Sequence, residues 1–130
     1  MANPAKAKGT RFENEVLELL RRVWPSADRA KAGNPSNDFH GIPFPVEAKH
    51  RKRWEIPKWV GGLRQVAGGD DRWALVVASG DRRSEGGSTV VVFDINFAME
   101  LLGCWENRRH SALVEMALAD PETVEEAANS

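Results

Sequence analysis

The sequence has a single cysteine, Cys104, among its 130 residues. One cysteine excludes a disulfide within the chain, and a zinc site would need several further ligands. The apolar runs fall far short of the roughly 20 residues that a transmembrane helix needs, so no membrane span is expected. The first eight residues contain no apolar core of the kind found in signal peptides. These absences together predict a reducing, intracellular setting.

Two further absences narrow the function. There is no glycine-rich phosphate loop and no internal repeat, which argues against a P-loop nucleotidase and a repeat protein. The net charge is only −1, so the whole chain has no overall attraction for nucleic acid. Its distribution is uneven, because residues 1–59 carry 12 Lys and Arg against 7 Asp and Glu, whereas residues 60–130 carry 6 against 12. The basic half can attract phosphate locally, although an uneven solvated surface has the same pattern.

What is present is typical of one globular domain, with 42% hydrophobic and 28% charged residues. Thr10 and Glu13 have the spacing of a helix-capping box, and Gly103 is placed to end a later helix. We predict helices over residues 10–23, 57–67 and 95–102, and strands over residues 27–32, 37–42, 46–51, 72–79 and 89–93. This order predicts a mixed α/β fold with helices flanking a central sheet.

The candidate chemistry is in the segment from Val46 to Lys49. Side chains alternate along a strand, so Glu47 and Lys49 project together from one face while Val46 and Ala48 face the other. Asp38, on the preceding predicted strand, can supply a second carboxylate. Two carboxylates with waters are the oxygen ligands that Mg²⁺ prefers. An E-x-K tripeptide by itself fits an exposed ion pair equally well, and its placement beside Asp38 favours a catalytic site.

These residues also resemble a known family. Lys8–Val16, Asn37-Asp38 and Val46–Lys49 are similar to the pattern of PD-(D/E)XK nucleases, and in particular to archaeal-type Holliday junction resolvases. The resemblance covers roughly residues 8–79, and Asn37 departs from it by standing where the pattern's proline would be. It implies a restriction-endonuclease-like αβββαβ core with a central mixed sheet, here over residues 9–103. Residues 1–8 would then be a flexible basic arm, and residues 104–130 an acidic segment that is either a peripheral helix or partly disordered.

The resemblance also implies roles for individual residues. Asp38 and Glu47 match the principal metal-binding carboxylates, Glu13 matches the helix glutamate that assists them, and Lys49 matches the catalytic lysine. Without the resemblance, Glu13 could equally complete the capping box and Asp38 could cap a turn. The implied activity is Mg²⁺-dependent hydrolysis of DNA phosphodiester bonds by an endonuclease, with Mn²⁺ as an expected substitute. A homodimer is also implied.

Basic residues on both sides of the motif are the expected DNA contacts, with Trp54 able to stack on a base. They are Lys6, Lys8, Arg11, His50, Arg51, Lys52, Arg53 and Trp54. For the segment from His50 to Trp54, the alternative is a charged loop whose tryptophan belongs to the core. The expected partner is branched or double-stranded DNA. The expected location is the cytoplasm or nucleoid, which for a phage-encoded enzyme would be that of the host cell. A flap, nicking or restriction-like nuclease, or a catalytically silent DNA-binding module, remain alternatives.

Overall fold

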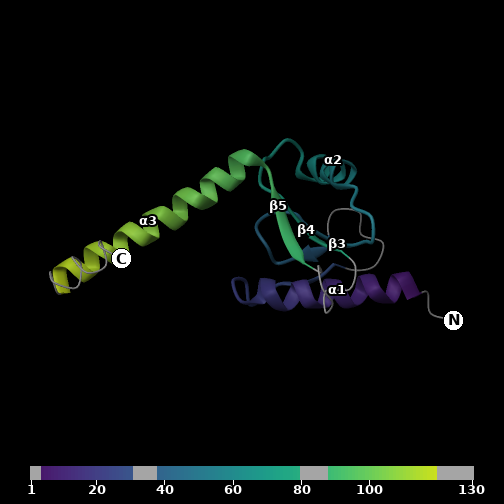
Figure 1. Ribbon diagram of the computed structural model, residues 1–130, viewed down its shortest axis with the longest axis horizontal. Helices are drawn as coiled ribbons and strands as arrows, with labels where there is room; N and C mark the ends of the chain where they lie inside the picture. The colour runs from purple at the N-terminus through teal and green to yellow at the C-terminus, as the bar shows by residue number, and fades with distance from the viewer. Residues whose placement is uncertain (1–3, 31–37, 80–87, 120–130) are drawn as a thin grey trace. The chain divides into compact units, whose positions relative to one another are not determined.

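The computed structural model describes residues 4–30, 38–79 and 88–119, with the backbone alone for residues 4–8. Within these residues the protein is a mixed α/β fold whose element order matches the predicted one (Figure 1). The chain forms two compact units, Met1–Asp94 and Ile95–Ser130. The elements are α1 (Pro4–Arg21), β1 (Asp28–Arg29), β2 (Phe39–His40), β3 (Val46–His50), α2 (Ile56–Ala67), β4 (Ala74–Ala78), β5 (Thr89–Phe93) and α3 (Ile95–Ala119).

Helix α1 begins earlier than predicted. It starts at Pro4, so Thr10 lies inside the helix and the predicted capping box is wrong. Residues 4–8 of the predicted flexible arm are helical, which is understandable because proline suits the first turn and Ala and Lys are good helix formers. The buried face of α1 comprises Phe12, Val16 and Leu17, whereas Leu19 is exposed. Val23, just after the helix, is also exposed.

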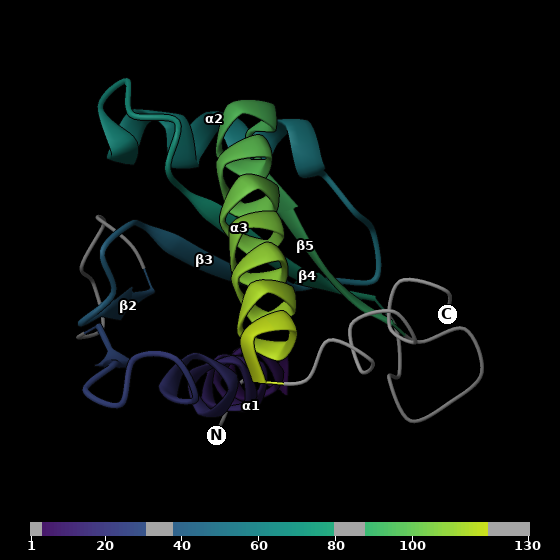
Figure 2. The ribbon, with the colours of Figure 1, turned by 90° about the vertical axis from the view of Figure 1, so that its left-hand side faces the viewer.

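The larger sheet has three strands in the order β3-β4-β5 (Figure 2). Strands β3 and β4 are parallel, with Val46 opposite Ala74 and His50 opposite Ala78. Strands β4 and β5 are antiparallel, with Val76 opposite Val91. The sequence predicted that all five strands belong to one central sheet. Among the described residues, β1 and β2 instead form a separate two-stranded antiparallel sheet. Gly41 follows β2 and has a φ of +80°, in the left-handed region that favours glycine. Its Cα also lies close to Ser26, because a Cβ on residue 41 would be only 2.8 Å from the carbonyl oxygen of Ser26.

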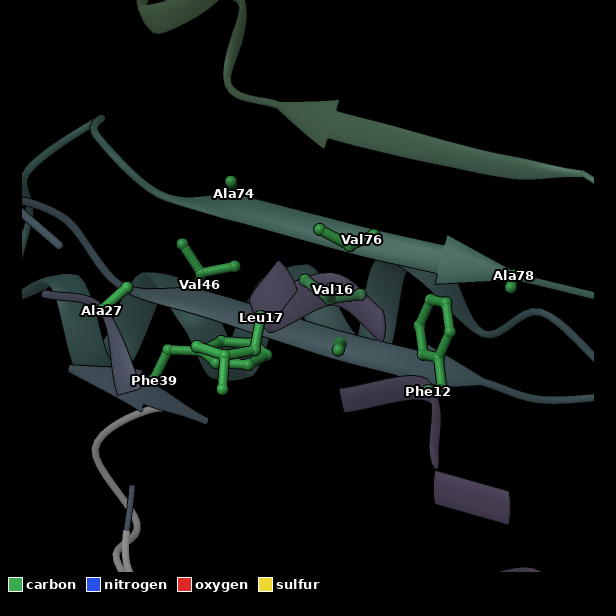
Figure 3. Close-up of a cluster of buried hydrophobic side chains, with 10 residues drawn as sticks. Phe12, Val16, Leu17, Ala27, Phe39, Val46, Ala74, Val76 and Ala78 are labelled. Carbon is green, nitrogen blue, oxygen red and sulfur yellow. The ribbon is translucent and has the colours of Figure 1, made fainter. Parts of the chain in front are cut away.

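The sheet is covered by helices on both faces within the first unit. On one face, α1 packs Phe12, Val16 and Leu17 against Val46 and Val76 (Figure 3). On the other face, α2 contributes Trp59 and Leu63 to a cluster with Trp73, Leu75 and Val77. Trp59 and Trp73 are therefore both core residues. Two layers of packed side chains therefore enclose β3, the strand that carries Glu47 and Lys49.

The remaining helices differ in how well they were predicted. Helix α2 has nearly the predicted bounds and ends at Gly68, whose φ of +62° is the left-handed conformation of a helix C-cap. Helix α3 runs through Gly103 to Ala119, so the predicted end at Gly103 is wrong. A glycine inside a helix costs only about 1 kcal/mol, and good helix formers on both sides offset that cost. In the described part of the chain, no helix is long and apolar enough to cross a membrane.

Candidate active site

Strand β3 presents Glu47 and Lys49 on the sheet face covered by α2. Their partners across the parallel pairing are Leu75 and Val77, which belong to the core on that face. The Lys49 Nζ lies 2.9 Å from the Glu47 Oε1, and both side chains are mostly shielded from solvent. The same ammonium lies 5.9 Å from the centroid of the Trp59 ring. The predicted alternation of this strand is confirmed, because Val46 and Ala48 are buried on the opposite face.

Asp38 is attached to the outer edge of β3 by two hydrogen bonds. Its backbone N–H donates to the Val46 carbonyl oxygen at 3.2 Å. Its side-chain Oδ2 accepts from the Ala48 N–H at 2.8 Å. The Asp38 carboxylate is therefore held beside the strand between the positions of Glu47 and Lys49. The sequence alone predicted that Asp38 would meet Glu47 and Lys49 across a turn. The two hydrogen bonds show that Asp38 lies beside Ala48, the residue between them.

The environment of Asp38 is unusual for a carboxylate. Burial raises the pKa of Asp38 to about 6, from its ordinary value of 3.8. The Ala48 N–H opposes this effect by stabilising the charged form. The negative charges of Glu13 and Glu47 raise the pKa further, and Lys49 lowers it. The four predicted catalytic residues thus interact electrostatically at one edge of the sheet.

Glu13 reaches this edge from α1, on the sheet face opposite Glu47. Its Oε2 accepts a 2.9 Å charged hydrogen bond from Arg29 Nη2. Arg29 lies on β1, where it is opposite Phe39, the neighbour of Asp38. Its Nε is buried without a hydrogen-bond partner among the described residues. Glu13 therefore faces the candidate site in a salt bridge and does not cap the helix.

Sequence reasoning missed Arg29. The only signal was its position on a predicted strand next to that of Asp38, and many arginines occupy such positions. Its approach to Glu13 depends on how β1 and β2 pair, since the two residues are 16 positions apart in the chain. The pairing brings a fixed positive charge to the edge that carries the carboxylates.

The donor chemistry of the site fits a hard divalent cation. Mg²⁺ is bound in proteins by one or two carboxylates together with waters and substrate phosphate. Asp38 and Glu47 supply such oxygens, and a cation would stabilise the charged form of Asp38, whose pKa is raised by burial and then by the charges of Glu13 and Glu47. The described residues contain no cluster of three or more His, Cys, Asp or Glu side chains arranged as a metal site. The arrangement fits an ion shared with phosphate and water better than a closed structural metal site.

The predicted DNA contacts divide into three groups. Arg11, Arg51, Lys52, Arg53 and Trp54 are exposed, the last four on the loop between β3 and α2. His50 is half-buried, with its ring centroid 5.3 Å from that of Phe12. The side chains of Lys6 and Lys8, like residue Asn37, lie outside the described residues. The exposed loop directly follows the strand that carries Glu47 and Lys49.

Comparisons with known proteins add no relative. No family model matches the sequence, and neither the curated proteins nor the solved structures gave a significant match. The functional interpretation therefore depends on the geometry of the site and on the sequence resemblance.

Proposed function

We propose that the protein is a Mg²⁺-dependent DNA endonuclease with four-way junctions as its substrate. The observation that carries the proposal is the placement of the Asp38 carboxylate against Ala48, between Glu47 and Lys49. This arrangement joins two carboxylates and an ammonium at one strand edge. The element order from α1 to β4 is that of the αβββαβ core of PD-(D/E)XK nucleases, which supports the same proposal.

The residues divide the chemistry between them. Asp38 and Glu47 would hold the metal, with Glu13 assisting from α1. A Mg²⁺ ion held there would lower the pKa of its bound water and neutralise charge on the phosphate. Lys49 donates hydrogen bonds to the attacking water or to a phosphate oxygen, which stabilises the charge that develops in the transition state. The water oxygen would bond to phosphorus as the water loses a proton to solvent. The P–O bond opposite to it would break and the leaving sugar oxygen would take up a proton from solvent, without a covalent enzyme intermediate.

The present ion pair between Lys49 and Glu47 is compatible with this role. A cation bound to Glu47 would weaken the attraction of that carboxylate for Lys49, since both positive charges compete for the same oxygens. The ammonium would then be available for the phosphate, while the Trp59 ring keeps it near the strand. Lys49 would therefore exchange its ion pair with Glu47 for a contact with the substrate phosphate.

DNA would lie across the exposed basic loop of Arg51, Lys52 and Arg53. Lysine and arginine contacts to phosphate supply affinity that does not depend on base sequence. Trp54, exposed on the same loop, can stack on an unpaired base at a junction or flap. We expect the protein to act on DNA inside the cell, as a homodimer.

Cleavage of a substrate panel tests the proposal. Labelled four-way junction, flap, linear duplex and single-stranded DNA are each incubated with the protein and Mg²⁺. Paired, symmetric nicks in the junction are expected. If the protein cuts the flap or the duplex in preference to the junction, the proposed nuclease activity stands but the proposed substrate is wrong. Dimer shape and loops decide which DNA structure fits.

A silent DNA-binding module is the alternative from another class. Thermal stability measured against Mg²⁺ concentration separates the two possibilities. The nuclease is expected to show a metal-dependent stabilisation that disappears in Asp38→Ala. Binding of junction DNA with no response to Mg²⁺ and no cleavage would favour the silent module.

A further inference from the structure

Lys49 has two close partners among the residues that the structure describes. Its ammonium lies 2.9 Å from the Glu47 carboxylate and 5.9 Å from the centroid of the Trp59 ring. A cation within about 6 Å of an aromatic ring is attracted by the negative face of the ring, and tryptophan gives the strongest attraction. Glu47 is the partner that the proposed metal would take. Trp59 is the partner that would remain.

The sheet surface beside Lys49 is aliphatic. Across the parallel pairing of β3 and β4, Lys49 lies opposite Val77, and Glu47 lies opposite Leu75. Both β4 side chains are fully buried, and Trp59 packs against them from α2 in the same cluster. An aliphatic side chain contains no acceptor for an ammonium. Trp59, rather than Leu75 or Val77, therefore attracts the cation from this cluster.

A lysine side chain that loses its ion pair gains conformational freedom. It is long and flexible, so an ammonium without a partner turns towards solvent, where it is hydrated. The Lys49 side chain is only 23% exposed, and the partial exclusion of water strengthens the attraction between the cation and the ring. The Trp59 ring therefore opposes the escape of the ammonium at the stage where Glu47 no longer holds it.

We infer that Trp59 is a positioning residue, whose ring face keeps the Lys49 ammonium beside β3 once Glu47 is no longer its partner. The inference rests on the proposed function for the event that removes Glu47, which is the binding of Mg²⁺. Trp59 is buried in the core cluster, so it acts through Lys49 and does not itself contact the DNA. Its role exceeds that of a packing residue, because it depends on the charge distribution of the ring and on the Lys49 ammonium.

Nuclear Overhauser effects between the Lys49 Hε protons and the Trp59 ring protons test the contact in the full chain. The lysine signals are assigned by their disappearance in Lys49→Met. The cross-peaks are expected in the wild type and should persist when Mg²⁺ saturates the protein. Glu47→Ala should keep them too, since it removes the ion pair without any metal. Loss of the cross-peaks in Glu47→Ala, or on addition of Mg²⁺, would overturn the inference.

Single-turnover cleavage of junction DNA measures the consequence for the proposed reaction. At saturating DNA and Mg²⁺, Trp59→Leu is expected to cut about tenfold more slowly than the wild type. Trp59→Phe should lie between the two, because phenylalanine keeps a weaker ring face. The DNA affinity of both variants, measured in Ca²⁺, should equal that of the wild type. Trp73→Phe, in the same buried cluster, is the matched control and should cut at the wild-type rate.

A double-mutant cycle with Lys49→Met separates positioning from packing. If the ring acts through the ammonium, Trp59→Phe should slow cleavage by the wild type and leave the residual rate of Lys49→Met unchanged. Equal slowing in both backgrounds, or a loss of DNA affinity in place of rate, would show that Trp59 only packs the core and would contradict the inference. If the wild type cuts no DNA, the proposed function fails, and the cross-peaks in Glu47→Ala still decide whether Trp59 holds Lys49.

Discussion

The Asp38 carboxylate accepts a 2.8 Å hydrogen bond from the backbone N–H of Ala48, the residue between Glu47 and Lys49. A backbone N–H has no rotamer that would move it away, so this bond fixes the Asp38 carboxylate beside the strand that carries Glu47 and Lys49. The carboxylate is also largely buried, and its pKa is raised to about 6. A rigid carboxylate that is costly to ionise is poised to gain from a bound cation.

The first prediction concerns stability and pH. The pKa of Asp38 is higher in the folded protein than its ordinary value of 3.8, so the folded state holds the proton more tightly. Between about pH 4 and pH 6 the folded state therefore binds more protons than the unfolded state, and stability falls as the pH rises. Asp38→Asn removes this loss. Above pH 7 the variant should be more stable than wild type by on the order of 2–3 kcal/mol in urea unfolding without metal.

Comparison across pH isolates the contribution of Asp38. Near pH 3, where the carboxyl is mostly protonated in both states, the two proteins should differ little. The exposed residue Glu115 on α3 supplies a matched control, and Glu115→Gln should follow the wild-type profile. A constant difference between wild type and Asp38→Asn at every pH would contradict the account, because titration would then play no part.

Lys49 is expected to act on cleavage rather than on binding. Lys49→Met keeps an unbranched side chain of similar length beside Trp59 but removes the ammonium that would donate to the reacting phosphate. We expect the cleavage rate to fall by about 100-fold or more, with the affinity for junction DNA nearly unchanged. Single-turnover cleavage and a binding assay in Ca²⁺ measure the two quantities. Equal loss of binding and cleavage would make Lys49 a DNA contact instead.

Arg29 is expected to oppose metal binding. Its guanidinium lies 2.9 Å from the Glu13 carboxylate and adds positive charge beside the site. Arg29→Gln should therefore strengthen Mg²⁺ binding by about fivefold in calorimetry, or about 1 kcal/mol. The control is Arg64→Gln on α2, which removes the same charge and breaks the 3.8 Å ion pair between Arg64 and Asp94. Weaker Mg²⁺ binding in Arg29→Gln would show that Arg29 instead holds Glu13 in its binding position.

The loop after β3 is expected to contact phosphate. The double substitution Arg51→Ala with Lys52→Ala should weaken DNA binding and reduce the slope of log K against log salt by about 2. The cleavage rate of saturated complex should remain close to that of wild type. Arg108→Ala, which removes an exposed arginine from α3, is the matched control and should leave the slope unchanged. An unchanged slope in the double variant would place the DNA elsewhere.

The central part of the fold could be predicted because its signals are local. The alternation from Val46 to His50 indicated which side chains share a face, and the apolar segments over β4 and β5 indicated strands. Both segments predicted buried strands; this is confirmed for β4 and wrong for β5, most of which is exposed. The ends of α1 and α3 were not predictable in the same way. Thr10 and Gly103 have the chemistry of helix ends, but the good helix formers around them outweigh a single cap or glycine.

The candidate site was predictable in its residues but not in its contacts. Glu47 and Lys49 are two positions apart, so the strand alone brings them together. The contact between Glu13 and Arg29 depends on the packing of α1 beside the small β1–β2 sheet, which short-range patterns do not encode. The burial that raises the pKa of Asp38 likewise comes from several elements at once.

Cleavage of a labelled four-way junction by wild type and by Asp38→Asn, each with and without Mg²⁺, tests the central claim most directly. Asparagine keeps the size of the side chain and can still accept the Ala48 hydrogen bond, so the fold should be preserved. The account predicts paired nicks by wild type with Mg²⁺, and none by the variant or without the metal. Equal cleavage by the folded variant, or no cleavage by a wild type that binds the junction, would contradict it.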